Sequence, residues 1–243
     1  GGINWVRLPR VGRTMSSNDI ERLKQEYARR ANDPGKDYSP ANPVQAFILS
    51  QRRIALQALL SDHHLQDLSG LRILEIGCGS GGVLNEFIQL GASSNNLFGI
   101  DLLPDRLTLA HSQNPSTNLC HADGQRLPYF PSAFDLVLQF TAFSSILDPE
   151  VKQNMAAEML RVLKPGGALI WYDFWWNPTN KQTKGIRPRE IKHLFPGCLV
   201  DLRRVTLAPP ITKLILPLSY WAAGTLESMK ILNSHLLGLI KKT

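Results

Sequence analysis

A glycine-rich turn follows the apolar run at residues 73–76. The stretch reads ILEIGCGSGG, from Ile73 to Gly82, and its glycines satisfy both G-x-G-x-x-G and G-x-G-x-G. Glycines in such a turn permit unusual backbone angles and leave no side chain between a ligand and the main chain. The turn by itself fits a dinucleotide site, a site for another nucleotide-like ligand, or a purely structural tight turn.

Three acidic residues surround this turn in the expected strand order. Glu75 lies two residues before the first glycine, where a carboxylate suits an ammonium group and not a pyrophosphate. Asp101 ends the run FGID, where a carboxylate accepts hydrogen bonds from ribose hydroxyls. Asp123, in HADGQ, can accept a bond from an adenine amino group, and Gly124 leaves room for the ring. Together these residues predict a nucleoside that carries a cation.

Apolar runs alternate with helical patterns from residue 71 onward, and both faces of the runs are apolar. This pattern indicates parallel strands covered by helices on each side, a doubly wound α/β fold. The expected strands are Leu71–Ile76, Asn96–Asp101, Thr117–His121, Phe134–Phe140, Ala168–Asp173, Leu199–Leu207 and His235–Lys242. The expected helices are Asn18–Ala31, Pro43–Leu60, Val83–Leu90, Arg106–His111, Glu150–Leu163 and Pro188–Leu194. Lys164–Gly167 is expected to separate the fifth of these helices from the next strand.

The order and spacing of these segments resemble class I S-adenosylmethionine-dependent methyltransferases, close to the small-molecule branch that includes the type 11 and ubiquinone-biosynthesis-like enzymes. The resemblance rests on LEIGCGSG (Leu74–Gly81), GIDLLPDRL (Gly99–Leu107), ADGQRLPYFPSAFDLVLQF (Ala122–Phe140) and RVLKPGGALIWYDF (Arg161–Phe174). It implies a Rossmann-like, seven-stranded sheet whose last strand is antiparallel, with helices on both faces. It also implies an N-terminal helical cap, a helical insert between the last two strands, and S-adenosylmethionine as the cofactor.

The resemblance further implies which residues bind the cofactor. The glycine turn packs against the methionine part, the acid at Asp101 holds the ribose, and the acid at Asp123 faces the adenine. Tyr27 and Arg30 lie on one side of the first expected helix and close over the cofactor in this hypothesis, with a plain surface helix as the alternative. The expected cofactor residues are Tyr27, Arg30, Glu75, Gly77, Cys78, Gly79, Gly81, Asp101, Leu102, Ala122, Asp123, Gly124, Gln139 and Phe140.

Methyl transfer from a sulfonium is a direct displacement, in which the protein mainly aligns the reactants. A hydroxyl acceptor also benefits from a general base. Asp173 is the first candidate because it ends the fifth strand at the carboxyl edge of the sheet, and a bracing or helix-capping role is the alternative. His193 and His235 are further candidates, whereas His111 and His121 are interpreted as structural.

Signatures of other methyltransferase classes are missing after the fourth strand. QFTAFSS, at residues 139–145, has neither the Asn/Asp-Pro-Pro-aromatic motif of base-amine and protein-amide enzymes nor a Pro-Cys pair for attack on a pyrimidine. Asp173 and Asn177 lack the acidic partner that a catechol-type metal site needs. We therefore expect no metal ion and no nucleic-acid partner.

Basic residues concentrate in the last quarter of the chain. The formal net charge is +7, and residues 181–243 contain eleven Lys and Arg against three Asp and Glu. Such a surface favours an anionic partner or is simply solvated. Three unpaired-looking cysteines, no apolar run of about 18 residues and no signal segment predict a cytoplasmic protein.

We expect a single domain with two variable segments. Residues 1–60 form the N-terminal cap and residues 61–243 the methyltransferase domain, with an insert at 208–234 as a substrate lid. Within the insert, LILPLSYWAAGTL is too short to span a bilayer, so a lid and a peripheral membrane contact are the two interpretations. Trp171 is expected in the core, and Trp175 and Trp176 are expected to line an acceptor pocket.

The sequence thus predicts methyl transfer to a small or carrier-linked acceptor. The leading hypothesis is O-methylation of a sugar, glycan or secondary-metabolite intermediate, because the C-terminal section resembles methyltransferases of bacterial polysaccharide and secondary-metabolite pathways. N- or carboxyl-methylation of a natural product or short peptide is one alternative. RNA methylation and an inactive cofactor-binding scaffold subunit are the others.

Overall fold

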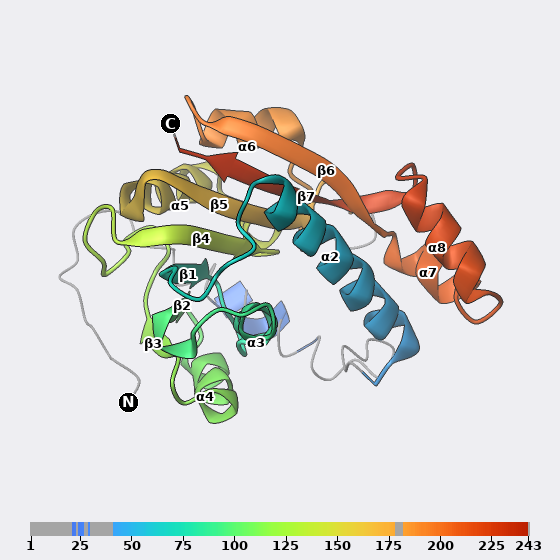
Figure 1. The fold of residues 1–243 in the computed structure, drawn as a ribbon, viewed down its shortest axis with the longest axis horizontal. Coiled ribbons are helices and arrows are strands. Elements are labelled where there is room, and N and C mark those ends of the chain that lie inside the picture. The colour runs from blue at the N-terminus through green and yellow to red at the C-terminus, as the bar shows by residue number, and fades with distance from the viewer. Residues whose placement is uncertain (1–20, 23, 27–28, 30–40, 178–181, 243) are drawn as a thin grey trace.

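The structure is a computed structural model, and it describes residues 21–22, 24–26, 29, 41–177 and 182–242. The strands are β1 (Ile73–Ile76), β2 (Leu97–Asp101), β3 (Asn118–His121), β4 (Phe134–Phe140), β5 (Leu163–Phe174), β6 (Leu199–Leu207) and β7 (Asn233–Lys241). They form one seven-stranded sheet in the order β3-β2-β1-β4-β5-β7-β6 (Figure 1). Only β7 runs antiparallel to its neighbours, so the expected doubly wound architecture is confirmed.

The helices of the described residues begin and end close to the expected positions. They are α2 (Pro43–Asp62), α3 (Gly82–Gln89), α4 (Pro104–Gln113), α5 (Pro149–Val162), α6 (Pro188–Leu194), α7 (Pro209–Ile215) and α8 (Tyr220–Ser228), with single 3₁₀ turns η1 (Ser94–Asn96) and η2 (Phe143–Ser145). Five of the α-helices start on proline, whose fixed φ and missing N–H suit the first turn. The helix expected at residues 18–31 falls mostly outside the described residues.

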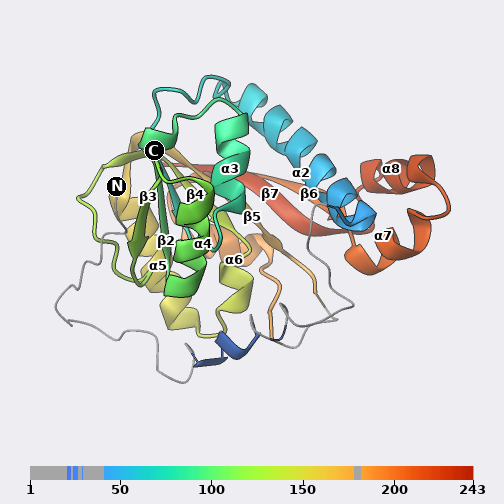
Figure 2. The ribbon, with the colours of Figure 1, turned by 90° about the horizontal axis from the view of Figure 1, so that it is seen from below.

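The helices cover the two faces of the sheet unequally, as Figure 2 shows from below. In β4, Leu136, Leu138 and Phe140 pack with side chains of α2, α3 and α4, whereas Val137 packs with side chains of α5 and α6. This alternation follows from the two-residue period of a strand, and both faces are apolar because both are buried. The predicted burial of Trp171 is confirmed, since its side chain is fully buried among the α5–α6 layer.

The start of β5 differs from the expectation. Helix α5 ends at Val162, as expected, but β5 begins directly at Leu163, so the expected separating turn is wrong. Phe134 pairs with Leu163 and Leu136 with Ala168, which leaves residues 164–167 as a bulge inside the strand. The bulge is physically possible because Gly166 has a φ of +72°.

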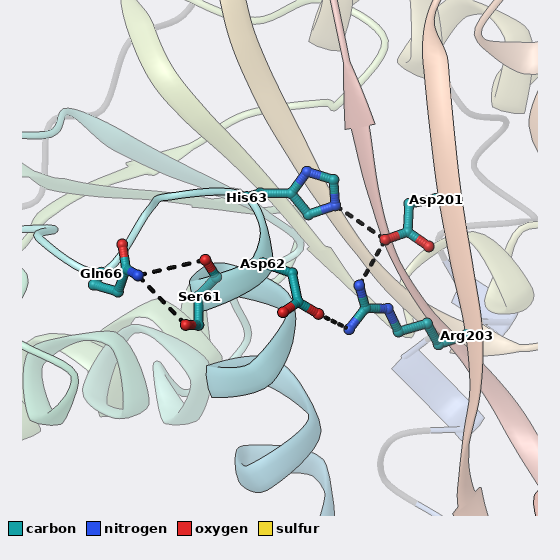
Figure 3. Close-up of polar contacts among 6 residues, drawn as sticks. All are labelled: Ser61, Asp62, His63, Gln66, Asp201 and Arg203. Atoms are coloured by element: carbon teal, nitrogen blue, oxygen red, sulfur yellow. Dashed lines mark hydrogen bonds and ion pairs between the residues drawn. The ribbon is translucent and has the colours of Figure 1, made fainter.

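A polar cluster joins the end of α2 to β6 on the amino-edge side of the molecule (Figure 3). His63 Nε2 lies 3.0 Å from Asp201 Oδ2, and Arg203 donates to Asp201 and to Asp62, both at 2.8 Å. The Arg203 guanidinium holds the pKa of Asp201 below its ordinary value. These contacts fix α2 on the sheet and lie away from the glycine turn.

Candidate cofactor and acceptor site

The carboxyl edge of the parallel strands gathers most of the predicted site residues. Glu75 in β1 pairs with Gly99 of β2 and with Leu138 of β4, which places it between these strands one residue from the end of β1. Asp101 ends β2, and Gln139 and Phe140 end β4. Open α/β sheets bind ligands at this edge, beside the point where the strand order reverses, which here is β1.

The glycine turn is held against the end of β2 by backbone hydrogen bonds. The N–H groups of Gly77 and Cys78 both donate to the Ile100 carbonyl oxygen, at 2.8 and 2.9 Å. Gly77, Gly79 and Gly81 have φ values of +72°, +54° and +82°, which side chains disfavour. The turn therefore needs glycine for its backbone angles, and α3 begins directly after it at Gly82.

Gly79 also leaves room for a cationic side chain from α4. A Cβ atom at position 79 would lie 2.2 Å from Nη2 of Arg106. The Arg106 guanidinium thus lies against the turn and near the carboxylates of Glu75 and Asp101. Sequence reasoning did not select Arg106, although it stands in the GIDLLPDRL motif within the first turn of a helix that starts beside the site.

Glu75 is a buried carboxylate with an oxygen that needs a partner. Its side chain is 2% exposed, and Oε2 makes no hydrogen bond with any described residue. Burial raises the pKa of Glu75 to about 8, although the charge of Arg52 opposes this shift. An unpartnered buried carboxylate oxygen beside a bare glycine turn fits the approach of a ligand that carries a cation.

Asp101 is buried and its carboxylate is oriented by the turn. Oδ2 accepts from Gly79 N at 2.8 Å, and Oδ1 accepts from Leu103 N at 2.9 Å. A carboxylate oxygen can accept a further bond, so these contacts orient the group and leave it capacity for ribose hydroxyls. Its predicted role is compatible with this geometry.

The segment after β3 bends so that Asp123 faces its own chain. Asp123 Oδ1 accepts from Gln125 N at 2.9 Å. The space beside Gly124 is filled by Met155 and Ile76, since a Cβ there would lie 2.8 Å from Met155 Cε. A side chain at position 124 would therefore have to displace the flexible end of Met155.

Asp173 is fully buried and braces the loop after β4. Oδ2 accepts from Ser144 N at 3.0 Å, and Oδ1 accepts from Phe174 N at 2.8 Å. Burial raises its pKa to about 6 against the effect of these hydrogen bonds. The bracing contacts support the structural alternative, and the role of general base stays a prediction.

A buried aromatic stack crosses β4, β5 and β7 on the face of the sheet opposite to the Asp173 side chain. The ring of Tyr172 stacks on Phe140 at 5.5 Å and on the imidazole of His235 at 4.8 Å between centroids. Burial and the charge of Arg52 lower the pKa of His235 to about 3, so its ring is neutral near pH 7. His235 Nδ1 lies 3.0 Å from Ser234 Oγ.

Arg52 is a second residue that sequence reasoning missed. Its guanidinium forms an ion pair with the buried Glu86 and lies 5.4 and 5.3 Å from the ring centroids of Phe140 and Tyr172. Its Nε atom is buried without a partner among the described residues. The sequence offered a signal, because Arg52 lies four residues from Ile48 in an apolar helical stripe.

The remaining predicted residues fall into four groups. Cys78 is buried against Gly99, and Leu102, Ala122 and Phe140 lie at the ends of β2, β3 and β4 with the rest of the site. Trp175 donates from Nε1 to Asn233 O at 2.8 Å, whereas Trp176 is exposed, so only the latter is open to a ligand.

The structure confirms that His111 lies in a helix, His121 at a strand end and His193 on α6. Tyr27 and Arg30 lie outside the described residues.

No group of three or more His, Cys, Asp or Glu is placed to hold a metal ion in the part of the chain that the structure describes. Within the same residues, no helix is long and apolar enough to cross a membrane.

Comparisons with known proteins match the central part of the chain to methyltransferases. A family model described as a methyltransferase domain matches residues 73–167. A phthiotriol/phenolphthiotriol dimycocerosates methyltransferase of Mycobacterium leprae is 33% identical over 117 residues, 47% of this chain and 41% of the relative. A sterol 4-C-methyltransferase of Caenorhabditis elegans is 32% identical over 106 residues, 41% of this chain and 30% of the relative.

Solved structures with a similar fold include a methyltransferase as well. A crystal structure of a SAM-dependent methyltransferase from Archaeoglobus fulgidus superposes with a TM-score of 0.53 at 17% identity, covering 83% of this chain and all of that one. Residues 73–167 match a methyltransferase domain, and the sheet has the fold of S-adenosylmethionine-dependent methyltransferases. The family and the fold imply S-adenosylmethionine as its cofactor. The matches span 41% and 30% of the two curated relatives, so the acceptor is a matter for proposal.

Proposed function

We propose that this chain transfers the methyl group of S-adenosylmethionine to a hydroxyl oxygen of a lipid or glycolipid acceptor. The observation that carries the proposal is the cation-accepting cofactor site at the carboxyl edge, beside which the buried stack of Phe140, Tyr172 and His235 lies. The names of the two relatives, which act on dimycocerosates and on a sterol, support an apolar acceptor. A glycolipid acceptor also carries a sugar hydroxyl, which the leading hypothesis from the sequence names as the methylated group.

The described residues fit the cofactor. Glu75 offers an unpartnered carboxylate oxygen to an ammonium group, and Asp101 offers two oriented oxygens to hydroxyls. The bound cofactor supplies a methyl group on a sulfonium, which is already an activated leaving group. The protein therefore contributes mainly by aligning the acceptor, an effect that reaches about 7–11 kcal/mol in favourable cases.

Asp173 is the proposed base for the acceptor hydroxyl. A pKa near 6 leaves it ionised at neutral pH and makes it a stronger base than an ordinary aspartate. Each of its oxygens accepts one backbone bond and can accept another. His235 is neutral at this pH and is the second choice.

Isotope transfer tests the proposal. The protein is incubated with methyl-deuterated S-adenosylmethionine and separate lipid and aqueous extracts of its native host, and products are followed by mass spectrometry. We expect label in the lipid extract, and none with the Asp101→Ala variant. Label confined to water-soluble glycans, RNA or protein contradicts the acceptor class. No label despite measured S-adenosylhomocysteine binding supports the inactive-scaffold alternative instead.

A further inference from the structure

Large exposed apolar side chains concentrate in one part of the molecule. We name residues 209–232, which comprise α7, α8 and the segments that join them to each other and to β7, the α7–α8 hairpin. Among the described residues, seven of the thirteen large apolar side chains that are exposed belong to these 24 residues: Leu214, Leu218, Tyr220, Trp221, Met229, Ile231 and Leu232. Leu218 and Trp221 are each 79% exposed. A concentration of large exposed apolar side chains in one short segment is typical of an interaction site.

The hairpin exposes these residues even though it also packs against the core. Its inner side packs on Phe47 of α2 and Leu207 of β6, through Ala223 and through Ile211 and Ile215. The ring of Tyr220 meets that of Phe47 edge-on at 5.3 Å between centroids. A helix pair that buries one apolar side and still presents a second one requires another apolar partner for that second side.

The charges of the hairpin favour an anionic partner. Glu227 is its only acidic residue, and this side chain is buried, accepts from Thr206 N at 3.1 Å and pairs with Lys230 at 2.8 Å. The hairpin therefore carries two lysines against one buried carboxylate, so its net charge is positive. A second copy of this chain, with its formal charge of +7, repels such a surface at long range.

The hairpin also lies at the edge of the sheet that holds the site. Because β6 and β5 run in the same direction, Leu207 ends β6 at the carboxyl edge, and α7 follows two residues later. Figures 1 and 2 both show α7 and α8 projecting from the end of the sheet beyond β6 and β7. A surface bound by the hairpin would thus be on the side of the molecule from which an acceptor reaches the cofactor residues.

We propose that the α7–α8 hairpin docks this protein on an anionic lipid bilayer. Leu214, Leu218 and Trp221 enter the interface between head groups and acyl chains, where tryptophan and tyrosine side chains are favoured. The net positive charge of the hairpin attracts the lipid phosphates. A lipid acceptor of the class proposed above would then reach the site from the bilayer. Binding to the bilayer itself does not require methyl transfer.

Vesicle binding tests the inference directly. Co-sedimentation is measured with vesicles of phosphatidylcholine alone and of phosphatidylcholine mixed with phosphatidylglycerol. We expect binding to the mixed vesicles that weakens with added salt, and a loss of about tenfold or more in the Leu218→Glu/Trp221→Glu double variant. The matched control is Leu109→Glu/Phe130→Glu, because Leu109 and Phe130 are 56% and 87% exposed elsewhere on the surface. This control should bind as the unmodified protein does.

A second readout does not depend on any change of fold. Lipids with brominated acyl chains should quench part of the tryptophan fluorescence of the bound protein, and the Trp221→Phe variant should lose that part. Equal vesicle binding by the hairpin double variant, or equal binding to both vesicle types, overturns the proposal. Failure of the unmodified protein to bind vesicles, with a dimer that the double variant disrupts, assigns the surface to a second copy. Because none of these assays involves an acceptor, they can fail while the proposed function stands.

Discussion

The glycine turn and the α7–α8 hairpin lie at the same edge of the sheet but are specified in opposite ways. At the turn, three positive φ values and a buried carboxylate leave few alternatives to Gly77, Gly79, Gly81 and Glu75. At the hairpin, many different apolar residues could form the exposed surface. Which of them are exposed depends on which side of each helix the sheet covers. A ligand site of fixed geometry is thus built from constrained backbone, whereas a surface for a fluid partner needs only area and charge.

Substitutions on the two sides of the hairpin should differ most in how far they lower the free energy of unfolding. Phe47→Ala removes the ring under the inner side and should lower the free energy of unfolding by about 3 kcal/mol, because it leaves a cavity. Leu218→Ala, on the outer side, should change it by less than about 0.5 kcal/mol. Urea denaturation measures both. Equal losses would mean that the outer side is packed, and the contrast between turn and hairpin would disappear.

Asp101→Ala should cause the largest loss of cofactor affinity. The substitution removes the predicted ribose contacts and leaves the N–H groups of Gly79 and Leu103 without their acceptor. A cost of about 1–3 kcal/mol corresponds to S-adenosylhomocysteine binding that is roughly 5–150 times weaker by calorimetry. Asp105→Ala, an exposed acid in the first turn of α4, is the matched control and should bind normally. Unchanged affinity of the Asp101 variant would refute its assignment.

Glu75 should release a proton when the cofactor binds. Its pKa of about 8 leaves it mostly protonated at pH 7, and an approaching ammonium group favours the ionised form. Calorimetry in two buffers of different ionisation enthalpy should show release of up to about one proton, and Glu75→Gln should show none. Because the folded-state pKa lies above the ordinary 4.5, the unliganded protein should lose stability as the pH rises from 4.5 towards 8.

The smallest effect is expected at the Asp201–Arg203 cluster of Figure 3. Arg203→Ala should cost about 0–1 kcal/mol, less at high salt, and should leave cofactor and vesicle binding unchanged. Since Arg203 lowers the pKa of Asp201, the contribution should be present near neutrality and fade as the pH falls below about 4. Arg189→Ala, an exposed arginine on α6, is the control. A loss of cofactor affinity in the Arg203 variant would show that the amino-edge contacts and the turn are coupled.

The regular parts of the fold could be predicted closely from the sequence. Strand β6 and helix α6 have the predicted bounds, because a strand pattern and a proline-started apolar helix are local signals. The start of β5 was predicted wrongly, because residues 164–167 read as a turn and only the pairing of Leu163 with Phe134 shows that the strand continues through them. The positions of Arg52 and Arg106 in the site were missed, because both reach it from helices that approach it only in the folded chain.

The sequence by itself determined the cofactor class, because glycines at positive φ and acids at successive strand ends are requirements of single residues and of their spacing along the chain. The tertiary structure decided two other matters. It committed Asp173 to bracing two backbone N–H groups, and it covered one side of the hairpin while leaving Leu218 and Trp221 exposed. Burial and hydrogen-bond partners depend on segments far apart in the sequence, so they exist only once the sheet has brought those segments together.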